Sequence, residues 1–146
     1  MATTKNSKNT RRFIHIPPMA FNMSLAEHGK EANCLGYAFG KERIITLPYK
    51  GLSIAQAFKA MAIKNHISVT QVKSMSDIKD HKAFLVYGFY KMSKDAPNFH
   101  VVYVTESGLG FHKPNDSLAQ YVIINEQNGG IPGYEDGPSA IFVINE

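Results

Sequence analysis

Hydrophobic and polar positions follow a helical period over one stretch of the chain, Ser53 to Asn65. Its apolar residues recur three and four positions apart, so they fall on one face of an α-helix. These residues are Ile54, Ala57, Phe58, Met61 and Ala62. We therefore predict a helix here, with its apolar face in the core.

A second, shorter helix is predicted around the cysteine. Apolar residues recur between positions 24 and 40, and Asn33 is a residue type that commonly caps the start of a helix. Gly40 is a residue type that commonly follows the end of one. Cys34 would then lie in the first turn. The earlier apolar segment, Phe13 to Met19, carries two prolines, so we predict an extended segment there.

The second half of the chain changes to short segments rich in β-branched and aromatic residues, which are typical of strands. The predicted strands are Ala83–Tyr90, Phe99–Thr105, Gly108–His112, Tyr121–Asn125 and Ala140–Asn145. A glycine-rich loop, Glu126 to Pro138, separates the last two. Because the helices precede the strands, we predict an α+β fold in which N-terminal helices pack on one face of a C-terminal antiparallel β-sheet.

Length and charge indicate a single domain with a basic tail. The chain has 146 residues, 44% of them hydrophobic, which suffices for one sizeable core. The formal net charge is +4, and four basic residues near the start account for this excess: Lys5, Lys8, Arg11 and Arg12. We predict that residues 1–12 form a disordered basic tail and that residues 13–146 form one domain.

The same patterns bear on partners and location. No basic stripe is interleaved with aromatic residues, and no apolar run is long enough to span a membrane, so we expect neither a nucleic-acid nor a membrane partner. The first residues lack the apolar core of a secretory signal. We therefore expect the protein to be cytoplasmic as synthesised.

Cys34 is the one cysteine of the chain, so it cannot form an internal disulfide or a multi-thiolate metal site. Three interpretations follow: an inert core residue, a redox sensor or a catalytic nucleophile. A thiol attacks a carbonyl carbon as its thiolate, and both a helix N-terminus and a neighbouring imidazole lower its pKa. We favour the nucleophile, which would need a histidine partner.

Four of the six histidines are interpreted as surface residues. His66 follows the predicted helix and His81 lies in a charged connector, so we expect both to face water. His15 lies in the extended segment, and His28 in a polar stretch shortly before Cys34. His15 and His28 precede Cys34 and are therefore harder to dismiss as its partner than His66 and His81, but a surface position is the favoured interpretation for each.

His100 and His112 differ because they lie at the start of one predicted strand and at the end of the next. If these strands form a hairpin around Glu106 and Ser107, the two ends lie side by side and the imidazoles can meet. One ring would act as general base to Cys34 and the other would orient it.

These residues carry a resemblance to a known family. The segment His100-Val-Val-Tyr-Val, a turn containing glycine and then Phe111-His112 resemble the His-Val-Gly-Ile-Tyr … Ile-His pattern of NlpC-type cell-wall hydrolases, within the papain-like cysteine peptidase superfamily. Asn33-Cys34-Leu35-Gly36 is similar to the Asp-Cys-Ser-Gly motif that opens the family's catalytic helix, with Asn in place of Asp. The later His112-Lys113-Pro114 is also similar to papain-like proteins of phages and bacterial effectors.

The resemblance implies a papain-like domain over residues 13–146 in which Cys34 is the nucleophile, His100 the base and His112 the residue that orients it. Asn115 and Asp116 compete with His112 for the orienting role, because papain itself uses an asparagine downstream of its histidine.

An oxyanion needs preorganised hydrogen-bond donors. The backbone N–H of Cys34 at the helix start is the natural first donor. The side-chain amide of Asn22, upstream of the cysteine, is a candidate for a second.

The resulting hypothesis is a cysteine hydrolase without cofactor that cleaves an amide or peptide bond through an acyl-enzyme. Its substrate would be a peptide, a protein or peptidoglycan, and a cell-wall substrate would require delivery by a phage or a secretion apparatus. The alternative is a non-catalytic papain-like module that sequesters a protein partner. His100 and His112 alone make a weak metal site, so no metal is expected.

Overall fold

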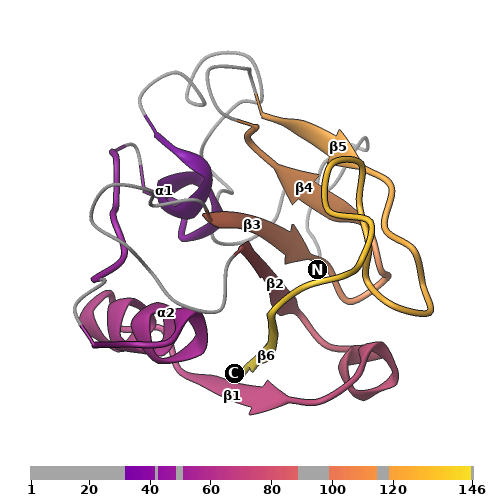
Figure 1. Cartoon of the computed structure of the whole chain (residues 1–146), viewed down its shortest axis with the longest axis horizontal. Coiled ribbons are helices and arrows are strands. Elements are labelled where there is room, and N and C mark those ends of the chain that lie inside the picture. Colours follow the sequence, from indigo (N-terminus) through magenta and orange to yellow (C-terminus); the bar gives the residue numbers. More distant parts are fainter. Residues whose placement is uncertain (1–31, 42, 49–50, 89–98, 115–118, 146) are drawn as a thin grey trace, which may run out of the picture.

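The computed structural model describes residues 32–41, 43–48, 51–88, 99–114 and 119–145 (Figure 1). Within these ranges the chain is an α+β fold with an open antiparallel sheet and two α-helices, which confirms the predicted class. The predicted tail, residues 1–12, and the predicted extended segment, Phe13 to Met19, lie outside the described residues.

The sheet has six strands in the order β1-β6-β2-β3-β4-β5, and every neighbouring pair is antiparallel. Their bounds are β1 (Val69–Val72), β2 (Ala83–Gly88), β3 (Phe99–Val104), β4 (Gly110–His112), β5 (Gln120–Val122) and β6 (Ala140–Ile144). The five predicted strands are present with shifted bounds: Thr105 and Gly108, for example, belong to the turn between β3 and β4, and β5 begins at Gln120. The sequence pattern missed β1, which pairs with the last strand.

The two α-helices begin directly after residues whose side chains cap their first turn. The helices are α1 (Cys34–Ala38), α2 (Ile54–Lys64) and the short 3-10 helix η3 (Met75–Ile78). At the start of α2, the Ser53 hydroxyl accepts a hydrogen bond from the Gln56 N–H, and the Gln56 side chain accepts one from the Ser53 N–H. This reciprocal capping box satisfies two donors that a helix start leaves unpaired.

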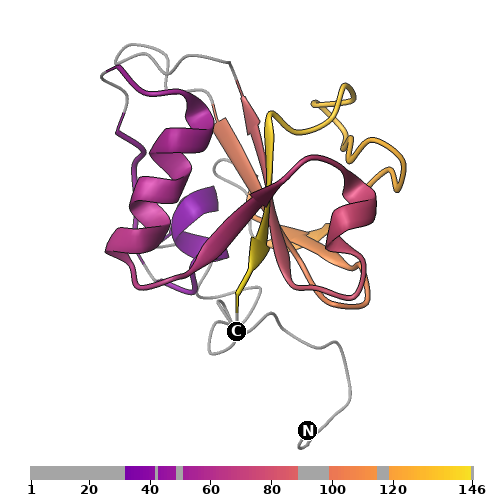
Figure 2. The ribbon, with the colours of Figure 1, turned by 90° about the horizontal axis from the view of Figure 1, so that it is seen from below.

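The two faces of the sheet are covered differently (Figure 2). Both α-helices pack on one face, over a core that holds an aromatic cluster with ring centroids 4.9–5.6 Å apart. This cluster consists of Phe39, Phe58, Phe84 and Phe142. Helix η3 and the segment between β5 and β6 cover the second face, over a smaller core. Burial of each such ring stabilises the fold by roughly 1.5–3 kcal/mol.

Candidate active site

The position of Cys34 is fixed by the side chain of Asn33, the N-cap of α1. The Oδ1 atom of Asn33 accepts hydrogen bonds from the N–H of Gly36 at 2.9 Å and of Ile45 at 3.1 Å, and its Nδ2 donates to the Ile45 carbonyl at 2.7 Å. The amide therefore caps α1 and ties it to the following segment. An aspartate could accept both bonds but could not donate the third.

The helix is held at its other end by its C-terminal turn. The N–H of Gly40 donates to the Tyr37 carbonyl and the N–H of Lys41 to the Gly36 carbonyl, with Gly40 at φ +75°. This is a Schellman motif, which requires the left-handed conformation that glycine adopts at little cost. The predicted cap at Asn33 and the predicted end at Gly40 are both confirmed.

A Cβ at Gly36 would collide with the Arg43 carbonyl oxygen, so α1 lies directly against this backbone.

The Cys34 thiol is buried at the edge of β3. Its Sγ donates a weak hydrogen bond to the Phe99 carbonyl at 3.9 Å. β4 pairs with β3 only at Tyr103 and Val104, so this earlier part of the β3 edge faces α1 instead of a strand. Burial raises the pKa of Cys34 to about 11, against the opposing effect of nearby backbone N–H groups, Val101 first, and of the Lys113 charge. The expectation of a lowered thiol pKa is therefore wrong for this conformation, because desolvation outweighs the helix start.

The two predicted histidines meet. The turn at Glu106 and Ser107 joins β3 to β4, and the Nε2 atom of His100 lies 2.7 Å from the Nδ1 atom of His112. The contact requires that one nitrogen carry a proton and the other a lone pair. If Nε2 of His100 is the donor, its Nδ1 keeps a free lone pair and can accept a proton. No residue in the described part of the chain hydrogen-bonds this Nδ1.

Aromatic rings enclose His100 on the second face of the sheet. Tyr134 stacks on it with centroids 5.9 Å apart and planes at 5°, and Tyr87 lies 6.3 Å away. Burial, and then the like charge of His112, lower the pKa of His100 to about 4. Burial also lowers the pKa of His112. Both rings are consequently neutral near pH 7, as a general base must be before it accepts a proton.

Cys34 and His100 approach the same edge of β3 from opposite faces. The side chains of Phe99 and Val101 belong to the core under the helices, so strand alternation directs His100 to the other face. Among the described residues, the thiol donates its hydrogen bond to the Phe99 carbonyl and makes none with an imidazole. The charge of the thiolate would nevertheless raise the pKa of Tyr134, in addition to burial, so the two side chains lie within electrostatic range of each other.

Five of the remaining candidates cannot be placed relative to this cluster. Asn22, Asn115, Asp116, His15 and His28 lie outside the described residues. His66 and His81 are exposed, as expected. Where the structure describes the chain, no group of three His, Cys, Asp or Glu residues is placed to hold a metal ion.

Two residues near the site were not predicted in any role. Tyr134 lies in the loop before β6, and the pattern of that loop indicates only irregular structure. Lys113 is only 5% exposed, although it follows His112 directly and its charge reaches Cys34. The position of Lys113 next to a candidate histidine could have indicated that it lies near the site. No local sequence pattern indicates this for Tyr134.

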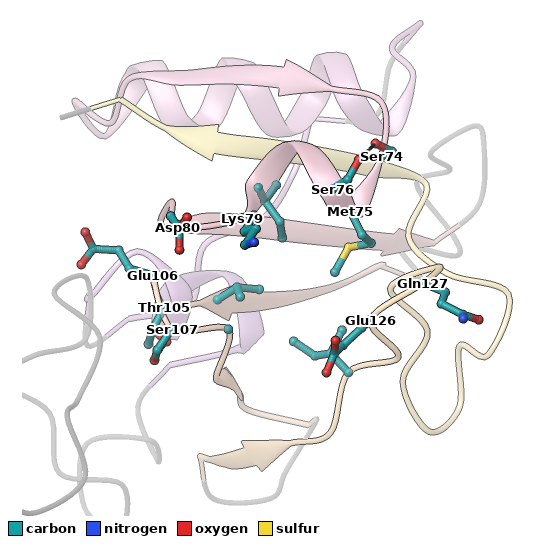
Figure 3. Close-up of a pocket in the computed structure, with 14 residues that line it drawn as sticks. Ser74, Met75, Ser76, Lys79, Asp80, Thr105, Glu106, Ser107, Glu126 and Gln127 are labelled. Carbon is teal, nitrogen blue, oxygen red and sulfur yellow. Dashed lines mark hydrogen bonds between the residues drawn. The ribbon is translucent and has the colours of Figure 1, made fainter.

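A hollow of about 710 Å³ lies on the second face of the sheet, away from this cluster (Figure 3). It is lined by η3, the β3–β4 turn and the residues after β5, with Asp80 and Glu106 at one end and Gln127 at the other. Its β3 lining residue is Val104, four positions and roughly 13 Å along the strand from His100. The lining has hydroxyls and carboxylates but neither cysteine nor histidine, so the hollow is not the thiol site.

Comparison with known proteins adds no relative to this picture. No protein-family model matches the chain, and the searches of curated proteins and of solved structures found no significant match. The interpretation of the site therefore rests on the residues themselves. Among the helices in the described ranges, none has the length and apolar character needed to cross a membrane.

Proposed function

We propose that the protein is a papain-like cysteine hydrolase that cleaves an amide or peptide bond through an acyl-enzyme at Cys34. The observation that carries the proposal is the 2.7 Å contact between His100 and His112 at the strand edge that also holds the Cys34 thiol. A nucleophile, a base and a residue that orients the base are the parts that such a reaction needs.

The proposed reaction begins with proton transfer and attack. Sγ of Cys34 attacks the carbonyl carbon of the substrate while its proton passes to Nδ1 of His100. This requires the thiol to turn from the Phe99 carbonyl toward the imidazole. The amine then leaves with the proton from His100, and the acyl group stays on sulfur. Water next attacks the acyl carbon, gives its proton to His100 and releases the acid, and the proton on His100 returns to sulfur.

The raised pKa of Cys34 and the lowered pKa of His100 favour a neutral pair before the substrate binds. The proton therefore moves during the attack, in general-base catalysis, instead of resting on the imidazole beforehand. In the first turn of α1 the N–H groups of Cys34 and Leu35 lie near the sulfur. They are the natural donors to the oxyanion that forms on the carbonyl oxygen.

The substrate class follows from the reaction type and from the resemblance to NlpC-type hydrolases. It would be a peptide, a protein substrate or a peptidoglycan stem peptide, and a cell-wall target would require delivery by a phage or a secretion apparatus.

An activated ester tests the chemistry without knowledge of the natural substrate. Incubation with p-nitrophenyl acetate should acetylate Cys34, as located by peptide mass spectrometry, faster than the same protein is acetylated in urea. His100→Ala should slow this acetylation roughly 100-fold. His66→Ala is the matched control, because His66 is exposed. Cys34 acetylation that is no faster in the folded protein would contradict a hydrolase.

A non-catalytic binding module is the second candidate, and one observation favours it. The thiol is 9% exposed and hydrogen-bonds a backbone carbonyl, as an inert core cysteine does. In that case the folded thiol should resist p-nitrophenyl acetate, and His100→Ala should leave its reactivity unchanged.

A further inference from the structure

Among the residues that the structure describes, the ring of His100 has three aromatic neighbours, each from a different segment of the chain. Tyr87 comes from β2, His112 from β4 and Tyr134 from the segment between β5 and β6. His112 meets the ring edge-on at 72° and Tyr87 is tilted by 37°, whereas Tyr134 lies parallel at 5°. Tyr134 is therefore the neighbour that presents its ring face to the imidazole.

A ring face carries negative charge density and attracts a cation within about 6 Å of its centroid. The centroid distance between Tyr134 and His100 is 5.9 Å. While His100 is neutral, this contact is an ordinary offset stack. When His100 accepts a proton it becomes a buried cation, and burial is the main cause that opposes this charge.

The segment that carries Tyr134 is held in place by several hydrogen bonds. The Tyr87 hydroxyl donates to the Gly129 carbonyl at 2.7 Å in the interior. The N–H of Tyr134 donates to the Ile131 carbonyl at 2.9 Å, and the N–H of Gly137 donates to the Tyr134 carbonyl at 3.2 Å. The hydroxyl of Tyr134 makes no hydrogen bond with the described residues, so the ring is the part of this side chain that is engaged.

We infer that Tyr134 is a positioning residue of the site: its ring holds the plane of the His100 imidazole and stabilises the imidazolium that forms as Cys34 attacks. The role of Tyr134 in turnover rests on the proposed function. The stabilisation of protonated His100 by the Tyr134 ring does not. It assigns a role to a loop residue that none of the sequence motifs contains.

Within each of the two experiments below, the other positions around His100 are the same in all the Tyr134 variants that are compared. They are Cys34 at the strand edge, Tyr87, His112 and, through its effect on Cys34, the Lys113 charge. A difference between two substitutions at Tyr134 therefore reports the ring itself.

The first experiment measures the pKa of His100 directly, by NMR of the imidazole carbons in the Cys34→Ala protein. The His100 signal is assigned by its loss in His100→Gln, and exposed His66 serves as an internal reference. Tyr134→Leu keeps an apolar cover but removes the ring face, so the pKa of His100 should fall by about half a pH unit. Tyr134→Phe keeps the ring and should restore the original value.

Each other outcome overturns the inference. A pKa of His100 that is unchanged or higher in Tyr134→Leu would mean that the residue acts only as a cover that excludes water. An equal fall in Tyr134→Leu and Tyr134→Phe would assign the effect to the hydroxyl.

The second experiment links this effect to turnover. In the protein with Cys34 intact, Tyr134→Leu should slow acetylation by p-nitrophenyl acetate about threefold, and Tyr134→Phe should restore the rate. If the starting protein is not acetylated at Cys34, the proposed function fails and the NMR result still stands. If the starting protein reacts and Tyr134→Leu reacts equally fast, the role in turnover fails alone.

Discussion

The Nε2 atom of His100 lies 2.7 Å from the Nδ1 atom of His112, and this contact occupies one nitrogen of each ring. The two residues come from neighbouring strands joined by the turn at Glu106 and Ser107. In the proposed mechanism, His112 accordingly determines which nitrogen of His100 remains available to Cys34. This arrangement makes the substitution of His112 informative.

His112→Phe should reduce the rate of Cys34 acetylation roughly 100-fold, because it removes the acceptor that keeps the proton on Nε2 of His100. It should also destabilise the fold by about 1–3 kcal/mol, since a buried donor loses its partner. His112→Asn retains an acceptor and should recover part of the rate. Comparison of the two variants in the p-nitrophenyl acetate assay is the measurement, and equal rates would contradict an orienting role.

Asn33→Asp should destabilise the fold although aspartate is a good N-cap. The Nδ2 donor to the Ile45 carbonyl is lost and a carboxylate oxygen faces that carbonyl instead, so we expect a cost of about 1–3 kcal/mol. The matched control is Asn125→Asp, because among the described residues the side chain of Asn125 accepts hydrogen bonds from the N–H groups of Gln127 and Asn128 and donates none. Urea unfolding should separate the two variants, and equal midpoints would show that the Asn33 bridge contributes nothing.

The stability of the protein should depend on pH through His100. Its pKa is about 4 in the folded protein and 6.5 ordinarily, so between these values the unfolded chain binds more protons. The contribution of His100 to the free energy of unfolding is therefore fully present above pH 6.5. It is lost as the pH is lowered toward 4, which decreases the free energy of unfolding by on the order of 3 kcal/mol. Urea unfolding across this range should show a weaker dependence on pH in His100→Gln than in the original protein. A His100→Gln curve parallel to the original would contradict the lowered pKa.

Tyr87→Phe should cost about 1–1.5 kcal/mol, because it removes the buried hydrogen bond to the Gly129 carbonyl. The same deletion at Tyr121, which is 42% exposed and whose ring packs on Phe111, should be close to neutral. Thermal unfolding of the two phenylalanine variants measures the difference. Similar midpoints would indicate that the Gly129 segment does not depend on this bond.

The fold elements with a strong local signal were predictable from the sequence. The helical period of Ser53 to Asn65 produced α2, and the residue types at Asn33 and Gly40 located the ends of α1. Strand β1, Val69–Val72, was missed because it is short and pairs with β6 near the opposite end of the chain. Pairing over such a separation leaves no pattern in a local window.

In the candidate site, too, only the contact with a local origin was predictable from the sequence. The meeting of His100 and His112 followed from a hairpin, which is a local structure. The stacking of Tyr134 on His100 and the burial that raises the pKa of Cys34 are products of tertiary packing. Neither can be read from the residues around them.

The segments that hold Cys34 and Phe99 lie 65 positions apart in the sequence, and they meet only when α1 docks against the open part of the β3 edge. The accessibility of the sulfur is therefore a local reporter of this docking. Detachment of α1 would expose an ordinary thiol, which alkylating agents modify faster while selective acetylation is lost. The two reactivities should change in opposite directions, so that labelling of one atom follows the opening of the helical layer in the otherwise folded protein.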